Sequence, residues 1–120
     1  MVSSYVDLVV WQRAMELVAE IYSVVKFLPK EETYALSDQM RRAAVSIPSN
    51  IAEGQARIST RDFANFLSIA KGSNAELHTQ LLICEKLGFL TQENITRAVS
   101  LSEEVGKMLF ALIQKLITDH

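Results

Sequence analysis

Residues Ser37–Arg57 have the sequence SDQMRRAAVSIPSNIAEGQAR, and this stretch decides the fold. Apolar residues recur at helical spacing on both sides of Pro48. An interior proline removes one backbone donor and costs ~3 kcal/mol. The unbroken register therefore predicts one continuous helix that bends at Pro48 and uses the bend. The alternative is a helix that ends at Ile47 and a second helix that starts at Ser49. The apolar positions that keep the register are Leu36, Met40, Ala43 or Ala44, Ile47 and Ile51.

Helical patterns fill the rest of the chain. Four glycines and two prolines leave little room for loops in 120 residues, and Ala, Leu, Ile and Glu are abundant. The expected helices span about residues 6–28, 32 or 33 to 52 or 54, 59–88 and 91–117, and residues 118–120 are expected to fray. Helices joined by short connections must alternate in direction. The sequence therefore predicts an all-α, antiparallel up-down four-helix bundle, kinked in its second helix, that forms a single domain over residues 1–120.

Short polar patterns mark two helix starts. Ser59 and Asp62 have the Ser-x-x-Asp spacing of a capping box, which predicts the start of the third helix. The fourth helix is expected to start at Thr91, with Leu90 and Ile95 placed as a hydrophobic staple.

Three glycines carry separate expectations. Gly54 and Gly88 are each expected at a left-handed position that ends a helix. Gly72 lies inside the third helix, where glycine costs ~1 kcal/mol relative to alanine. We expect Gly72, with Ser73 beside it, to allow close approach of a neighbouring helix.

Composition limits the class of protein. Hydrophobic residues make up 49% of the chain, which is enough for a packed core. The one cysteine, Cys84, excludes an internal disulfide and is expected in the core among leucines. No signal peptide and no apolar run of ~20 residues is visible, so the expected location is the cytoplasm and no membrane is expected as a partner.

The sequence offers no constellation for catalysis. A di-metal centre in a four-helix bundle needs Glu-x-x-His on two helices, but the residues three before His78 and His120 are Ala75 and Ile117. No glycine-rich phosphate loop, Ser/His/Asp order or Cys/His pair is present. We expect a protein that is not an enzyme, with no catalytic residue, functional metal site, cofactor or small-molecule substrate. His78 is expected at the surface or in an interface.

The stretch SIPSNIAEG at residues 46–54, with RRAA before it and Arg57 after it, resembles the central signature of proteins encoded within 23S ribosomal RNA intervening sequences, also called S23-type proteins. Further similarity covers roughly Tyr5 to Leu116. The resemblance implies a four-helix bundle with no established enzymatic activity. Relatives that serve diversity-generating retroelements form pentameric barrels that hold a reverse transcriptase and bind nucleic acid. The signature residues of this chain are Ser46, Pro48, Ser49, Asn50, Glu53 and Gly54.

Charge is uneven along an acidic chain. The net charge is −2, which argues against a general nucleic-acid coat. Residues 1–40 hold three basic and six acidic groups, residues 41–71 hold five and two, and residues 72–120 hold four and six. The centre of the chain is therefore a local basic region.

Four arginines of this region are the candidate contacts to nucleic acid or another partner, because guanidinium groups suit bidentate phosphate contact. They are Arg41, Arg42, Arg57 and Arg61. Asp38 precedes Arg42 by four residues and Glu53 precedes Arg57 by four, which favours ordinary surface ion pairs instead. A solvated or subunit-interface role for the arginines stays open beside the nucleic-acid role.

The first helix has a broad apolar face. Its main stripe is expected at Leu8, Trp11, Met15, Val18, Tyr22 and Val25, widened by Leu17, Ile21, Val24 and Leu28. Further apolar residues lie off the main stripes: Val2, Tyr5, Val6, Val9, Val10, Val45 and Ile58. A small monomer rarely exposes so much apolar surface, so we expect self-association. With the resemblance, this predicts a homopentameric adaptor for structured RNA or a reverse transcriptase; the alternative is a protein-interaction module without nucleic-acid contact.

Overall fold

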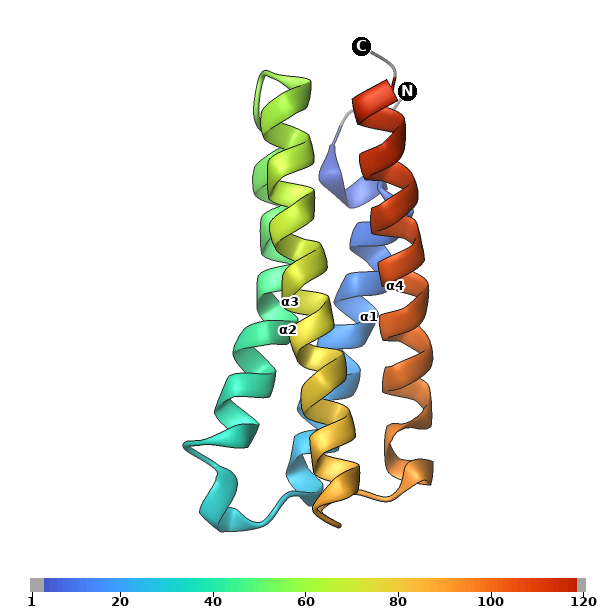
Figure 1. Cartoon of the computed structure of the whole chain (residues 1–120). Coiled ribbons are helices and arrows are strands. Elements are labelled where there is room, and N and C mark those ends of the chain that lie inside the picture. Colours follow the sequence, from blue (N-terminus) through green and yellow to red (C-terminus); the bar gives the residue numbers. More distant parts are fainter. Residues whose placement is uncertain (1–3, 119–120) are drawn as a thin grey trace.

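The computed structural model describes residues 4–118, and these residues form helices without any strand. Each long helix packs against two others, in the pairs α1–α2, α2–α3, α3–α4 and α1–α4 (Figure 1). The connections α1–α2 and α3–α4 lie at one end of the molecule, and the α2–α3 connection lies at the other (Figure 1). The prediction of four packed helices is confirmed. The helices are α1 (Val9–Val24), α2 (Leu36–Gln55), α3 (Thr60–Lys86) and α4 (Gln92–Thr118).

The first helix is shorter than the predicted span of residues 6–28. Tyr5–Asp7 forms a separate 3-10 turn because the Ser4 hydroxyl accepts a hydrogen bond from the Val6 amide, and Leu8 is extended. The chain tightens again into a 3-10 turn at Val25–Phe27. Both ends of the prediction are therefore wrong, because apolar spacing does not distinguish an α-helix from a short 3-10 turn beside it. Val2 lies outside the described residues.

The buried face of the first helix combines both predicted apolar rows, because Val25 of the main stripe is buried and Leu8, Trp11 and Val18 are partly buried against the core. Met15 and Tyr22, expected on the main stripe, are 44% and 45% exposed. Val10, expected at the surface, is buried. Both rows are apolar, so periodicity alone could not choose between them. The buried residues of α1 are Val10, Ala14, Leu17, Ile21 and Val24.

The second helix begins at Leu36, later than predicted, because residues 30–32 form their own 3-10 turn and Ala35 is not helical. It then continues through Pro48, which is buried, and ends at Gln55. The prediction of a helix that is continuous across Pro48 is confirmed, and the alternative of two separate helices is wrong.

The predicted starts of the third and fourth helices are confirmed. The Ser59 hydroxyl accepts a hydrogen bond from the Asp62 amide at 3.0 Å. Thr91 and Asn94 cap each other: the Asn94 amide donates to the Thr91 hydroxyl at 3.1 Å, and the Thr91 amide donates to the Asn94 side-chain oxygen at 3.0 Å. Gly88 has a φ of 78°, the left-handed value that was expected for the end of the third helix. The last helix continues to Thr118, further than predicted, and residues 119–120 lie outside the described part.

The core lies between all four helices and includes Cys84, as predicted. Its sulfur lies 3.7 Å from the Met40 sulfur, and the side chain is fully buried. Burial, with a smaller contribution from the charge of Glu32, raises the pKa of the Cys84 thiol to about 11. The thiol is therefore neutral and shielded, as in a structural cysteine.

Candidate nucleic-acid interface

The signature residues on α2 make a polar contact to α3. The hydroxyls of Ser46 and Ser73 lie 2.8 Å apart. The Asn50 side-chain amide donates to the backbone oxygen of Ser46 at 2.8 Å and to its hydroxyl at 2.9 Å. This network involves residues on both sides of the buried Pro48 in the sequence and links the middle of α2 to the middle of α3.

Gly54 allows a close approach between the same two helices. A Cβ atom at this position would lie 2.6 Å from the Phe66 Cβ and 3.1 Å from the Phe63 ring. Gly54 is helical rather than left-handed, so its predicted role as a helix end is wrong. Gly72 was expected to allow such an approach, but a Cβ there would meet nothing within 4 Å. The residue that sequence reasoning chose for close packing is therefore the wrong glycine.

Two signature residues, Ser49 and Glu53, are exposed. The Glu53 carboxylate pairs with Arg57 at 3.2 Å, as the spacing predicted. The other four signature residues are buried or half-buried: Ser46, Pro48, Asn50 and Gly54. Ser46 and Gly54 contact α3 directly, so part of the signature packs α2 on α3 and its exposed members are available to a partner.

Arg41 and Arg42 share one carboxylate near the start of α2. The Asp38 oxygens lie 3.8 Å from Arg41 and 3.3 Å from Arg42. The Arg42 side chain is 81% exposed, so its pair with Asp38 is a weak surface pair. Arg41 is more enclosed and lies 6.0 Å from the centre of the Tyr22 ring. Arg42 is thus the freer of the two cations.

Arg57 and Arg61 flank the turn between α2 and α3. The Arg57 guanidinium lies over the Phe66 ring at 4.7 Å, which fixes its direction. Arg61 is exposed and forms no ion pair with any residue between 4 and 118. Between them Ile58 is fully exposed. This corner therefore offers two cations around an apolar side chain.

The structure does not bring the four arginines into one patch. Arg41 lies near the start of α2 and Arg57 lies two residues beyond its end, and the helical part from Arg41 to Gln55 alone is about 21 Å long. The predicted basic region is therefore two pairs, one near the start of α2 and one at its end. A helix spreads the residues of one sequence segment along its axis. The number of charges in residues 41–71 suggested a single region because a count by segment ignores this separation in space.

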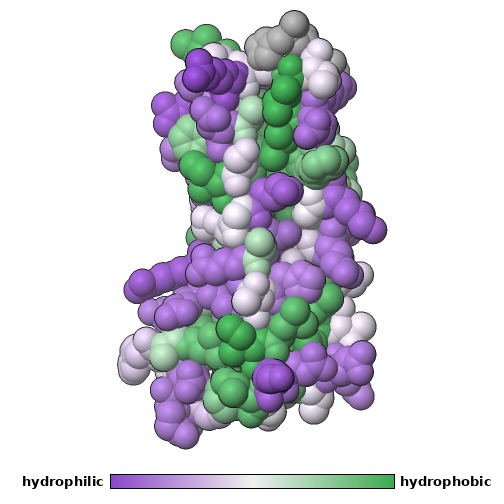
Figure 2. All heavy atoms as spheres, in the orientation of Figure 1, coloured by the Kyte–Doolittle hydropathy of each residue, from purple (hydrophilic) through white to green (hydrophobic). Residues whose placement is uncertain are grey.

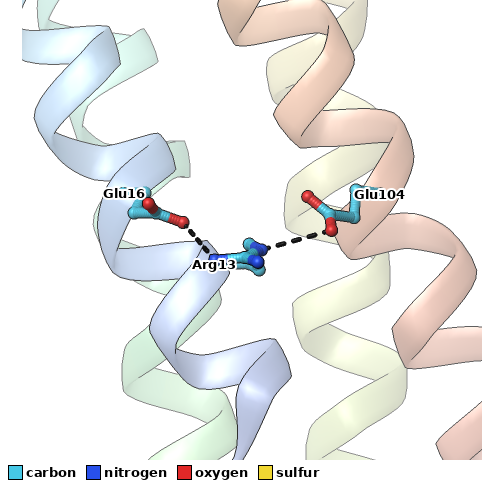
Figure 3. Close-up of polar contacts among 3 residues, drawn as sticks. All are labelled: Arg13, Glu16 and Glu104. Atoms are coloured by element: carbon cyan, nitrogen blue, oxygen red, sulfur yellow. Dashed lines mark hydrogen bonds and ion pairs between the residues drawn. The ribbon is translucent and has the colours of Figure 1, made fainter.

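The side formed by α1 and α4 is acidic. Arg13 bridges the two helices, because it lies 2.9 Å from Glu16 on α1 and 3.2 Å from Glu104 on α4 (Figure 3). The hydrogen bond to Glu16, followed by that to Glu104, raises the pKa of Arg13 above its ordinary value. Glu93 lines the same groove, and Arg97 pairs with Glu20 across it. The groove is lined by three carboxylates and two guanidinium groups, a composition that does not favour phosphate.

A second polar pair was missed by the sequence analysis. Asn74 donates to the backbone oxygen of Ser102 at 2.9 Å, and the Ser102 hydroxyl donates to Asn74 at 2.9 Å. Both side chains are buried between α3 and α4. The available signal was the position of Asn74, four residues after Ala70 and three before Leu77 on the apolar stripe of α3.

Beside this pair α3 and α4 leave an open groove of about 800 Å³. Gly72, His78 and Phe110 line the groove, together with Lys71 and Lys107. His78 is half-buried there, close to the surface position expected for it. Within residues 4–118, no three His, Cys, Asp or Glu residues are grouped so that they could hold a metal ion.

Exposed apolar side chains are spread over the molecule. Figure 2 shows hydrophobic atoms gathered on the lower part of one face, around the C-terminal half of α3, whose exposed apolar residues are Leu82, Ile83 and Leu87. Other exposed apolar residues belong to α1, α2 and the connections: Val9, Met15, Tyr22, Phe27, Tyr34, Val45 and Ile58. None of the helices described is long and apolar enough to cross a membrane.

Comparison with known proteins identifies the family. The family model of the 23S rRNA-intervening sequence protein matches residues 6–111. The chain belongs to this family. A similar solved structure is that of a protein with unknown function from the S23 ribosomal protein family of Bacteroides thetaiotaomicron, with 30% sequence identity and a TM-score of 0.81. The match covers 88% of this chain and 98% of that one. A search of the curated proteins finds no match.

Proposed function

We propose that this 23S rRNA-intervening sequence protein is a non-enzymatic, homo-oligomeric adaptor that holds a partner containing RNA or a reverse transcriptase in the cytoplasm. The observation that carries the proposal is the corner between α2 and α3, where Arg57 and Arg61 flank the fully exposed Ile58. Two arginines around an apolar side chain, one of them without an ion pair in the described residues, suit a nucleic-acid backbone or a protein that carries one. The family name supports a connection to ribosomal RNA genes.

One corner with two arginines would bind a partner weakly, and self-association would increase the overall affinity. The exposed apolar residues of α1 and α2 support burial between copies. We set the assembly at five subunits in a ring, on the resemblance to the accessory proteins of diversity-generating retroelements. Each copy then repeats the corner, and weak contacts add through multivalency.

The architecture that accompanies this assembly is an up-down bundle with antiparallel neighbours and a second helix bent at Pro48. The proline ring clashes with the carbonyl of the preceding turn, and this supports a bend. Replacing Pro48 with alanine should straighten α2, increase its local stability and weaken assembly. Equal assembly of the variant and the wild type would contradict a role for the bend in assembly.

Light scattering at micromolar concentration tests the assembly. The chain has a mass of 13.4 kDa. A mass close to that of the chain contradicts self-association, and a stable dimer contradicts the ring.

Binding of structured RNA at several salt concentrations tests the adaptor role, because phosphate-driven binding weakens as salt rises. The double variant Arg42→Gln/Arg61→Gln should keep the assembly and bind RNA more weakly. The matched control Arg97→Gln/Lys86→Gln removes the same charge elsewhere and should bind as the wild type does. If the first variant dissociates, the arginines belong to an interface.

A module that contacts proteins alone is the second candidate. It is favoured by the ion pairs of Arg41, Arg42 and Arg57 with neighbouring carboxylates, because these pairs reduce the charge available to phosphate. Unchanged RNA binding in the Arg42→Gln/Arg61→Gln variant, or no RNA binding by the wild type, would support this second candidate.

A further inference from the structure

A pocket of about 410 Å³ lies between the end of α1 and the start of α2. Three cationic side chains line it, and no acidic residue of the described chain does. Three side chains with hydroxyl groups and two apolar residues complete the lining. The polar lining residues are Lys26, Lys30, Arg41, Tyr22, Thr33 and Ser37. This composition is that of an anion site, since each polar group is a cation or a hydrogen-bond donor.

Ser37 is the residue that points to a ligand. It is only 3% exposed, and it lines the pocket. Its hydroxyl has no hydrogen-bond partner among residues 4–118, and Gln80 Oε1 is the one fully enclosed side-chain polar atom without a partner in that range, so the Ser37 hydroxyl opens into the pocket. A ligand in the pocket would offer it an acceptor in place of water.

Arg41 is held in place at the wall of this pocket. Its guanidinium donates to the backbone oxygen of Thr33 at 3.4 Å and lies 6.0 Å from the centre of the Tyr22 ring. The nearest carboxylate, Asp38, is 3.8 Å away and also pairs with Arg42 at 3.3 Å. Arg41 is therefore positioned without being fully neutralised.

The start of α2 adds to the positive potential. α2 begins at Leu36, between the pocket residues Thr33 and Ser37. The side chain of Ala35 at its N-cap cannot accept a hydrogen bond from the first helical amides. Free amides and the helix dipole both favour an anion at such an end. The nearby acid Glu32 acts on the buried thiol of Cys84 and does not line the pocket.

We propose that this pocket binds a phosphate monoester dianion, either inorganic phosphate or the terminal phosphate of an RNA chain. Lys26 and Lys30 supply charge, Arg41 supplies a fixed fork of donors, and the Ser37 hydroxyl donates to a phosphate oxygen. The site needs neither assembly nor the arginines of the α2–α3 corner, which lies at the opposite end of the molecule (Figure 1). The phosphate site can therefore be tested independently of the adaptor role.

Calorimetric titration with inorganic phosphate at constant ionic strength, with chloride as the reference anion, tests the site. The wild type should show saturable binding at millimolar phosphate. Lys26→Gln/Lys30→Gln should weaken the affinity about tenfold or more, and Ser37→Ala should weaken it several-fold. The matched control Lys71→Gln/Lys107→Gln removes the same charge from the α3–α4 groove and should bind as the wild type does.

Two results overturn the proposal: no saturable binding by the wild type, or equal weakening in the control and in Lys26→Gln/Lys30→Gln. Circular dichroism confirms that each variant is folded, which is expected because the exchanged lysines are exposed.

Competition with a short RNA separates the two sources of phosphate. If an RNA with a 5′-phosphate displaces inorganic phosphate and the same RNA with a 5′-hydroxyl does not, the ligand is a terminal phosphate. If neither competes, the ligand is free phosphate. If both compete equally, internal phosphodiesters occupy the pocket and the monoester proposal is wrong. The Arg42→Gln/Arg61→Gln variant should bind phosphate normally whether or not it binds RNA.

Discussion

The two sides of α3 meet their neighbours differently. Towards α2, Gly54 brings the backbones so close that a single added carbon would lie 2.6 Å from Phe66. Towards α4, the helices separate around a groove of about 800 Å³, and the only close polar contact described there is the buried pair of Asn74 and Ser102. The family-like signature lies on the tight side. The same helix therefore packs closely, backbone against backbone, on one side and leaves room beside a buried polar pair on the other.

Replacing Gly54 with alanine should break the tight side. The added methyl group meets the Phe66 Cβ, which is attached directly to the α3 backbone, so the helices must move apart. We expect the free energy of unfolding to fall by about 2–3 kcal/mol, measured by urea denaturation. Wild-type stability in this variant would show that the contact is not tight.

Replacing Asn74 with alanine should remove the buried hydrogen bonds between Asn74 on α3 and Ser102 on α4. The Ser102 hydroxyl loses its acceptor while it stays buried. We expect a loss of about 2 kcal/mol in the same denaturation experiment. Asn65→Ala, on an exposed position of α3, is the control and should change little. An equal loss in both variants would contradict a specific role for Asn74, because helix propensity alone predicts a gain when asparagine is replaced by alanine.

The stability of the protein at alkaline pH should show whether water reaches the Cys84 thiol between α2 and α3. The pKa of the Cys84 thiol is raised from an ordinary value of 9.0 to about 11 in the folded chain. Below pH 9 the thiol is neutral in both states. From pH 9 to 11 the unfolded chain loses the proton first, so the folded state loses stability, on the order of 1 kcal/mol at pH 10.

The measurement is the difference between the pH profiles of the wild type and Cys84→Ala, because this difference isolates the contribution of the thiol. Parallel profiles from pH 8 to 11 would show that the thiol is hydrated.

Replacing Gly72 with alanine should give the smallest effect, and one of opposite sign. A Cβ at this position meets nothing within 4 Å. Removing a mid-helix glycine should then stabilise the chain by about 0.5–1 kcal/mol, seen as a small rise in the midpoint of denaturation. Destabilisation would mean that α3 and α4 close over the groove in solution.

Local features of this fold were predictable from the sequence. The caps at Ser59 and Thr91, the left-handed Gly88 and the continuous helix through Pro48 each depend on residues within one or two turns. Such patterns act before any tertiary contact forms, so a single sequence contains them.

Features that depend on which surfaces meet were not predictable. Two positions on α1, Met15 and Tyr22, were assigned wrongly because two apolar rows compete. The close approach was expected at Gly72 and occurs at Gly54, because glycine spacing does not reveal the neighbouring helix. Lys26 and Lys30 belong to a segment that is acidic by count, yet they line a pocket with Arg41. Only the packing of α1 against α2 brings these cations together.

The burial of Cys84 has a practical consequence for labelling chemistry. It is the one cysteine in the sequence, and its side chain is fully enclosed. A cysteine introduced at an exposed position such as Ser49 or Ser100 would be the single reactive thiol of the native protein. Paired fluorophores, spin labels or subunit cross-links can then be placed one site at a time without first removing a native cysteine.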